Sequence, residues 1–342
     1  MNLTAKLLGP NTGLATLMAE LFEHLPDVSG GCEGVGARYW DRALIDPARD
    51  ILGRSGKGFR ALLLERCWRV AGGNDDGPPE ILPLLIELLH VGSLVIDDIE
   101  DDSPMRRGEP ALHRRYGVPI ALNTGNWLYF VPMALLPRAP LGDDLRLSIY
   151  QDVSLAMLRC HQGQALDLSI TIDGVPQREA PTLVARATQL KTGSLMELAS
   201  VIGARSAGAP ATTVERFARF GRELGIGLQM LDDWSGIANP SRIDKGVEDI
   251  RLGRLTWPWA WLAANSDEVA YASFMNQRRS MRDDEEIRLL IGLLRRRLAP
   301  IARQIVRGHL MDSIDDLQTA VDEAADLRPL TDDIQRLERA FG

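Results

Sequence analysis

Long segments with apolar residues at helical spacing constrain the fold of this chain more than any other feature. The segment 82–98, LPLLIELLHVGSLVIDD, is apolar on nearly every face, which is typical of a helix buried in the centre of a large bundle. Segments 143–170, 181–206 and 212–234 are further long helical candidates, and strand-like alternation is scarce. The C-terminal third is amphipathic and is expected at the periphery. The sequence therefore predicts an all-α fold.

Composition and charge narrow the classes of protein to consider. The 342 residues are 45% hydrophobic and carry a net charge of −8, which argues against nucleic acid as a partner. No segment marks a domain boundary, so we expect a single domain over residues 1–342. Cys32, Cys67 and Cys160 have no paired spacing and predict neither a disulfide framework nor a zinc site. No run of 18 apolar residues occurs, so we expect no stable membrane insertion and a cytoplasmic protein.

An acidic run follows the most apolar helix. In LVIDDIEDDSPMRRG (94–108) five carboxylates fall within six residues. If the helix continues, Asp97 and Asp101 lie one turn apart on one face, with Asp98 beside them. An acidic run is often only a solvated helix face, but carboxylates at the end of a buried helix are costly unless cations neutralise them. Oxygen ligands one turn apart suit Mg²⁺, and Arg106 and Arg107 offer forked donors for phosphate.

A second segment repeats this arrangement. In LGIGLQMLDDWSGI (224–237) an apolar helical stretch ends in Asp232 and Asp233, with Gln229 one turn earlier. Two such pairs facing each other would hold a cluster of Mg²⁺ ions. Gly236 stands where the first segment has its third acid, so the second site is weaker by one carboxylate.

The motifs together resemble the trans-isoprenyl diphosphate synthases, the polyprenyl synthetase family. DDIEDDSPMRRG is similar to that family's first aspartate-rich motif, and other segments follow in the family's order over most of the chain. These segments are GKGFRALL (56–63), ELLHVGSLVIDD (87–98), GQALDL (163–168), KTGSL (191–195), GLQMLDD (227–233) and DIRLGRLTWP (249–258).

The resemblance implies an isoprenoid-synthase-type helical bundle around a central cavity, found as a homodimer. It implies head-to-tail condensation of an allylic diphosphate with isopentenyl diphosphate, with Mg²⁺ as cofactor. The implied metal ligands are Asp97, Asp98, Asp101, Asp232 and Asp233. The residues implied in catalysis are Asp97, Asp98, Asp101, Lys191 and Asp232. The implied allylic diphosphate ligands are Arg106, Lys191, Thr192, Gln229 and Lys245. The implied isopentenyl diphosphate ligands are Lys57, Arg60, His90 and Arg107.

Small residues before the first motif bear on product length. The resemblance implies that the growing tail runs along the helix that ends in Asp97. Gly92 and Ser93 lie about one turn before Asp97 and are small, which predicts a C20 product, with C15 as the runner-up. Bulky residues on a neighbouring helix, Trp127, Tyr129 and Phe130, could close the cavity instead.

Three departures from the family pattern leave two rival functions open. The departures are Gly236 in place of an acid, a shortened spacing between Lys245 and Asp249, and Asn126 in place of an aspartate. A terpene cyclase on the same fold would ionise an allylic diphosphate without a second substrate. A non-catalytic regulatory subunit of a prenyl synthase would need no intact metal motif. The retained residues of both diphosphate sites favour the synthase.

Overall fold

The structure confirms the all-α prediction. It is a computed structural model that describes residues 36–56, 58–321 and 325–341, and within these ranges the only strands are the two-residue β1 and β2. By its internal contacts the chain divides into two compact units. Unit 1 is Met1–Asp152 with Ile202–Ala209, and unit 2 is Val153–Val201 with Pro210–Gly342. The single domain expected from the sequence stays a prediction.

Unit 1 is formed by the N-terminal helices and a short hairpin. Its elements are α3 (Ala37–Trp40), η1 (Asp41–Ile45), α4 (Asp46–Gly53), α5 (Phe59–Val70), α6 (Ile81–Glu100), β1 (Met105–Arg106), β2 (Glu109–Pro110), α7 (Leu112–Tyr116), α8 (Val118–Leu135) and η2 (Leu136–Arg138). Two further helices, α9 (Asp143–Ser169) and α11 (Ser194–Ser206), have residues in both units.

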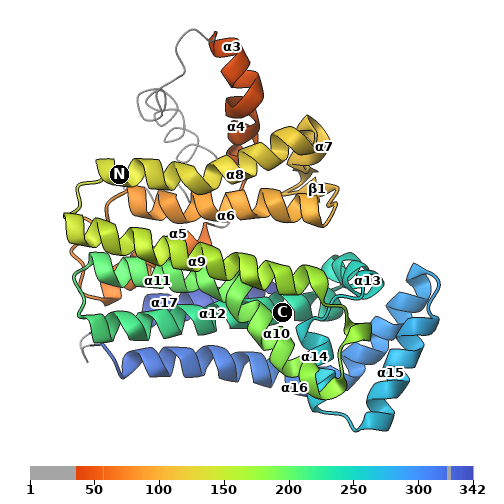
Figure 1. Cartoon of the computed structure of the whole chain (residues 1–342). Helices are drawn as coiled ribbons and strands as arrows, with labels where there is room; N and C mark the ends of the chain where they lie inside the picture. Colours follow the sequence, from red (N-terminus) through yellow and green to blue (C-terminus); the bar gives the residue numbers. More distant parts are fainter. Residues whose placement is uncertain (1–35, 57, 322–324, 342) are drawn as a thin grey trace. The chain divides into compact units, whose positions relative to one another are not determined.

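The apolar segment of the first motif forms α6, which lies alongside α8 (Figure 1). Glycines allow the two backbones to approach closely. A Cβ on Gly92 would lie 2.9 Å from the carbonyl oxygen of Gly125, and a Cβ on Gly125 would lie 2.8 Å from Ile96. Leu84, Leu88, Val91 and Val95 of α6 enter a buried cluster with residues of α4 and α8. Burial of this apolar surface fixes α6, and with it the position of the acidic run.

Unit 2 contains the remaining helices. Its elements are η3 (Ile172–Gly174), η4 (Gln177–Glu179), α10 (Ala180–Thr188), η5 (Gln189–Gly193), α12 (Ala211–Ala238), η6 (Pro240–Arg242), α13 (Ile243–Leu252), α14 (Trp257–Ala264), α15 (Glu268–Ser280), α16 (Asp284–Gln318) and α17 (Arg328–Phe341). The helix α12, which carries the second motif, packs against α13, α14 and α16. The buried residues of α16 recur every three or four positions, from Ile287 through Leu294 and Leu298 to Leu310, as the amphipathic pattern predicted.

The segment 181–206 is not the single regular helix that its periodicity suggested. It contains a π-helical turn, η5, between α10 and α11, and such turns are rare and often lie at functional sites. Two glycines on other helices make room for it. A Cβ on Gly163 would lie 2.3 Å from the backbone nitrogen of Lys191, and a Cβ on Gly225 would lie 2.8 Å from the Cα of Gly193. The turn therefore holds Lys191 and Thr192 at a defined place between α9 and α12.

None of the helices in the described ranges combines the length and the apolar character needed to cross a bilayer.

Candidate functional site

The first acidic run lies at the C-terminal end of α6, where its carboxylates have different environments. Asp98 is buried, with a side chain 1% exposed, whereas the Asp97 side chain is 24% exposed. Asp101 is the C-cap residue, and its backbone N–H donates to the carbonyl oxygen of Asp97 at 2.9 Å. Asp97 and Asp101 thus remain one turn apart, as expected. Glu100 and Asp102 are exposed.

A tight hairpin after α6 brings Arg106 back onto the acidic run. Arg106 pairs with Glu109, so the turn consists of Arg107 and Gly108, with φ angles of 55° and 81°. Two positive φ angles define the type I′ turn that suits a two-residue hairpin. Glycine adopts this conformation readily, but at Arg107 it is strained by about 1–3 kcal/mol.

Arg106 uses this position to hold Asp98. Its Nε donates to both carboxylate oxygens, at 2.8 and 3.0 Å, and its Nη2 donates to Oδ1. Burial raises the pKa of Asp98, although the hydrogen bonds from Arg106 oppose this effect. Arg106 Nη2 also lies 3.8 Å from a carboxylate oxygen of Asp97. The structure therefore directs Asp98, predicted as a metal ligand, to Arg106.

Cationic side chains from α5 and from the hairpin turn gather around His90 of α6. Arg60 Nη1 lies 3.1 Å from His90 Nε2. Burial, together with Arg60 and Arg107, holds the pKa of His90 well below its usual value, so the imidazole is neutral and Nε2 accepts from Arg60. The guanidinium of Arg107 donates to the carbonyl oxygen of Arg54 at 3.2 Å. Three of the four residues predicted for isopentenyl diphosphate thus come together in unit 1; the fourth, Lys57, lies outside the described residues.

Two buried charged side chains near this cluster, Glu87 and Arg54, indicate which kind of ligand it could hold. Glu87 accepts the backbone N–H of Ala61 at 3.3 Å, and burial raises its pKa despite Arg60 and Arg107 nearby. Arg54 is 8% exposed, and its buried Nη2 has no hydrogen-bond partner among the described residues. A buried guanidinium donor without a partner calls for an acceptor from elsewhere. The cluster is therefore suited to an anionic ligand.

The second motif lies at the end of α12, and its two aspartates have separate roles. Asp233 is 8% exposed and accepts Gln229 Nε2 at 2.8 Å and the backbone N–H of Trp257 at 3.0 Å. Gln229 in turn accepts the hydroxyl of Thr192 at 2.9 Å. Asp233, Gln229 and Thr192 thus form one chain of hydrogen bonds from α14 through α12 to η5. Burial raises the pKa of Asp233.

Asp232 carries the ion pairs of this motif. Its Oδ1 accepts Arg242 Nη2 at 2.8 Å, and its Oδ2 accepts the ammonium of Lys245. Burial would raise the pKa of Asp232, but Lys245 and Arg242 lower it. Lys245 also faces Asp249 one turn along α13, and burial raises the pKa of Asp249 to about 7. Lys245 therefore lies beside the second motif, whereas the ammonium of Lys191 pairs with Asp167 on α9 at 2.6 Å.

The structure gives a reason, which the motif alone did not reveal, why position 236 is a glycine and not an acid. A Cβ at Gly236 would lie 3.2 Å from the backbone nitrogen of Gly246, and a Cβ at Gly246 would lie 2.2 Å from the carbonyl oxygen of Gly236. The backbones of α12 and α13 are thus in contact here. An acidic side chain at position 236 would push α13, with Lys245, away from α12.

Several residues of the site were missed by sequence reasoning. Arg242 lies in a short turn after α12 and gave no periodic or motif signal. Trp257 begins α14, with Pro258 next in the first turn, and nothing in the sequence indicated the hydrogen bond from its backbone N–H to Asp233. Asp167 pairs with Lys191. Its place in the segment GQALDL (163–168), which is part of the resemblance, was the available sign that it belongs to the site.

The side chains proposed to control product length point in different directions. The ring of Tyr129 covers Gly92, since a Cβ there would lie 3.1 Å from two ring carbons. Trp127 packs against the cluster of α4, α6 and α8, and Phe130 is 71% exposed. Gly92 is thus small because helices meet there, not because it leaves a tunnel open. Ser93 is half-buried, and its hydroxyl donates to the carbonyl oxygen of His90 at 2.7 Å.

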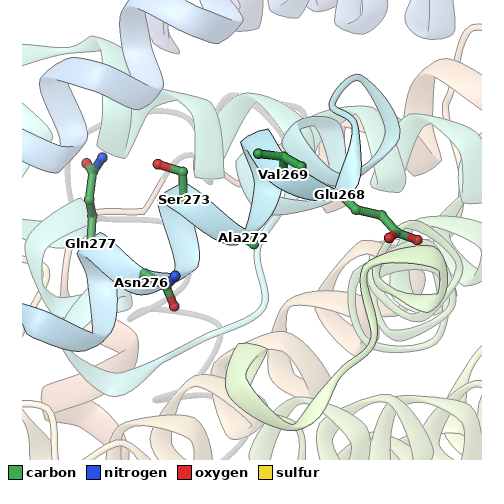
Figure 2. A pocket seen from close by; sticks show the side chains of 6 residues that line it. All are labelled: Glu268, Val269, Ala272, Ser273, Asn276 and Gln277. Atoms are coloured by element: carbon green, nitrogen blue, oxygen red, sulfur yellow. The ribbon is translucent and has the colours of Figure 1, made fainter.

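A surface depression of about 660 Å³ lies along α15 and does not fit a diphosphate. Figure 2 shows its six lining side chains, none of them cationic; these are Glu268, Val269, Ala272, Ser273, Asn276 and Gln277. A doubly or triply charged anion needs lysine or arginine donors. The predicted site residues lie on other elements.

A metal site must be judged from the donor sets of the two motifs. No group of three or more His, Cys, Asp or Glu side chains in the described ranges is arranged to hold a metal ion. Mg²⁺, however, is often bound through one or two carboxylates, with water and substrate phosphates as the other ligands. Asp97 and Asp101, one turn apart and with Asp97 partly exposed, fit such a site.

The profile of the family described as Polyprenyl synthetase matches residues 41–291. Among curated proteins, a geranylgeranyl pyrophosphate synthase of Eremothecium gossypii is 32% identical over 228 residues, which cover 64% of this chain and 68% of that protein.

Solved structures share the fold. A geranylgeranyl pyrophosphate synthase aligns with a TM-score of 0.74 at 20% identity, over 96% of this chain and 98% of its own. A geranylgeranyl pyrophosphate synthase of Corynebacterium glutamicum, complexed with isoprenyl diphosphate and magnesium, aligns with a TM-score of 0.71 at 19% identity, over 92% and 93% of the two chains. The predicted isoprenoid-synthase-type fold is confirmed.

Proposed function

Since the chain belongs to the polyprenyl synthetase family, we propose that it is a prenyltransferase that condenses an allylic diphosphate with isopentenyl diphosphate. The reaction joins the allylic C1 to the terminal alkene carbon of isopentenyl diphosphate, releases diphosphate and loses one proton. The product is a trans-prenyl diphosphate. The related protein of Eremothecium gossypii is named for the C20 product, which supports C20 over the runner-up C15.

The observation that carries this proposal is the cluster of arginine side chains around the neutral imidazole of His90. A terpene cyclase has no second diphosphate to bind, so it needs no second anion site. The cluster of Arg60, Arg107 and neutral His90 supports such a site in addition to the acidic run. Beside it lies Arg54 Nη2, which has no hydrogen-bond partner among the described residues. We assign isopentenyl diphosphate to it, with Lys57 as a further ligand.

The acidic run is proposed to take the metal. Mg²⁺ there would neutralise the diphosphate as negative charge develops on it. Of the five predicted ligands, Asp97 and Asp101 fit this role best, because each remains one turn from the other and Asp97 is partly exposed. Asp98 serves instead as the residue that orients Arg106 toward the run.

The allylic diphosphate is assigned to the remaining predicted donors. Arg106 supplies a guanidinium already oriented by Asp98, and Lys245 supplies an ammonium at Asp232. Gln229 and Thr192 are oriented by mutual hydrogen bonding. Lys191 is included because η5 fixes its backbone, and contact with substrate would require its ammonium to leave Asp167. Apolar side chains of α6 would exclude water from the allylic cation.

Incubation of the pure protein with Mg²⁺ and dimethylallyl, geranyl or farnesyl diphosphate tests the proposal. With isopentenyl diphosphate present, a prenyltransferase forms longer prenyl diphosphates. A cyclase consumes the allylic substrate alone and yields hydrocarbon or alcohol, and a regulatory subunit does neither. The assigned homodimer and cytoplasmic location, both expectations from the sequence, are tested by sedimentation and by cell fractionation.

A further inference from the structure

The second motif offers few carboxylate oxygens for a metal ion. A third acid is disfavoured at position 236, because a Cβ there would lie 3.2 Å from the backbone nitrogen of Gly246 on α13. Asp233 is buried, and its two oxygens accept donors from Gln229 and from the backbone of Trp257. Of the three positions that would be acidic in a complete motif, only Asp232 is left with an accessible carboxylate.

That carboxylate is paired with two cations rather than one. Arg242 binds Oδ1 and Lys245 binds Oδ2, and the three side chains are 31, 30 and 30% exposed. Lys245 also interacts with Asp233 and Asp249, so Arg242 adds a positive charge beside a lysine that already has carboxylate partners. That added charge repels a free divalent cation and attracts an anion.

Local structure holds Arg242 in place. It ends the 3₁₀ turn η6, which begins after Asn239, whose side chain accepts the backbone N–H of Ser241 at 3.0 Å. Arg242 Nη1 donates to the hydroxyl of Ser235 at 2.7 Å, while Nη2 donates to Asp232. Because these two bonds already fix the guanidinium, it would lose little further conformational entropy on binding a diphosphate.

We propose that Arg242 binds the substrate diphosphate directly and, at the end of α12, supplies positive charge that a metal ion held by a third acid would otherwise supply. This inference rests on the proposed function, since it assigns a ligand to the same reaction. It implies that the metal requirement of the protein resides in the acidic run of α6. It also implies that diphosphate binding at α12 persists without metal.

Isothermal titration with inorganic pyrophosphate in EDTA tests this inference. The parent is expected to bind, and Arg242→Gln to bind roughly 10- to 100-fold more weakly, as loss of a hydrogen bond between charged groups predicts. Arg242→Lys keeps the charge without the fork and should lie between them. Arg251→Gln is the matched control, because Arg251 lies on the exposed side of α13 and pairs with Asp284; it should bind like the parent.

Three outcomes would overturn the inference. They are no binding by the parent up to millimolar pyrophosphate, equal binding by Arg242→Gln and the parent, and an equal loss in Arg251→Gln. Circular dichroism and melting curves establish whether each variant is folded. If Arg242→Gln does not fold, Arg242→Lys replaces it in the comparison with the parent. Prenyl transfer is measured on the parent in parallel. If the parent catalyses prenyl transfer and Arg242→Gln binds pyrophosphate as tightly as the parent, only this inference is contradicted. If the parent binds pyrophosphate through Arg242 but catalyses no prenyl transfer, the proposed function is contradicted instead.

Discussion

At the scale of single residues, two carboxylates of the acidic run differ in their proposed roles: Asp97 is proposed to bind metal, whereas Asp102 faces solvent. Asp97→Asn is expected to lower kcat/KM by roughly 1,000-fold or more, because metal ligation contributes several kcal/mol to stabilising developing charge. Asp102→Asn is the control: this side chain is 78% exposed and pairs with Arg114, and asparagine tolerates its positive φ of 52°. Steady-state kinetics should find the control within tenfold of the parent; an Asp97→Asn enzyme equally close would contradict the metal assignment.

Glu65 on α5 predicts a dependence of stability on pH. Burial raises its pKa to about 7 from a usual value of 4.5, so the folded protein favours the protonated form. The stability contributed by that form is complete below about pH 4.5 and is lost as the pH rises through about 7. Glu65→Gln removes this loss and should stabilise the protein on the order of 1–3 kcal/mol at pH 8, with little effect at pH 4.5. Denaturant unfolding at both pH values checks this, with the exposed Asp75→Asn as control. An equal effect at both pH values would exclude titration of Glu65 as the cause.

At the scale of elements, the contact of α12 with α13 determines the electrostatics of the second motif. Gly246→Ala places a methyl group where the carbonyl oxygen of Gly236 already lies, so the helices must separate. We expect a loss of about 1–3 kcal/mol in unfolding free energy, typical of overpacking, and weaker pairing of Lys245 with Asp232. The matched control is Gly292→Ala in α16, where a Cβ meets no atom within 4 Å; it should be neutral or stabilise by up to about 1 kcal/mol. Thermal melts of both variants decide, and a Gly246→Ala protein as stable as Gly292→Ala would contradict the contact.

The same contact changes what Gly236→Asp should do. From the motif alone, an added acid would be expected to complete the second motif and tighten Mg²⁺ dependence. In the structure the new Cβ lies 3.2 Å from the backbone of Gly246, so the neighbour must yield first. We therefore expect Gly236→Asp to be less stable than the parent and no tighter in Mg²⁺ titrations of activity; a lower Mg²⁺ requirement at unchanged stability would show that α13 yields freely.

At the scale of the whole molecule, the positions of the long helices could be predicted from the sequence, but the hydrogen bonds between side chains of different elements could not. The apolar character of 82–98 on nearly every face predicted α6, and the helical spacing of apolar residues in 212–234 predicted α12, because both are properties of the segment alone. The π-helical turn at Lys191 escaped this reasoning, since it depends on Gly163 and Gly225 of other helices. Asp98 and Asp233 were predicted as ligands from their motif positions, but their hydrogen bonds come from a hairpin and from the start of α14. Arg242 lies in a turn, where no pattern marks a role.

The chain length of the prenyl diphosphate product depends on the shape of the whole site, and we expect one enlarged side chain to change it. Ser93 lies one turn before Asp97 and is half-buried, so Ser93→Phe adds an aromatic ring on the face along which the tail is expected to grow. Shape rather than affinity then decides where growth stops, and we expect the product to shorten from C20 to C15 or C10 while the first condensation continues. Phe130→Ala is the control, because Phe130 is 71% exposed and should leave product length unchanged. Chromatography of the dephosphorylated products measures both. If Ser93→Phe and the parent give the same length, Ser93 does not face the tail, and truncation of Trp127, which packs beside α6, becomes the next test of where growth ends.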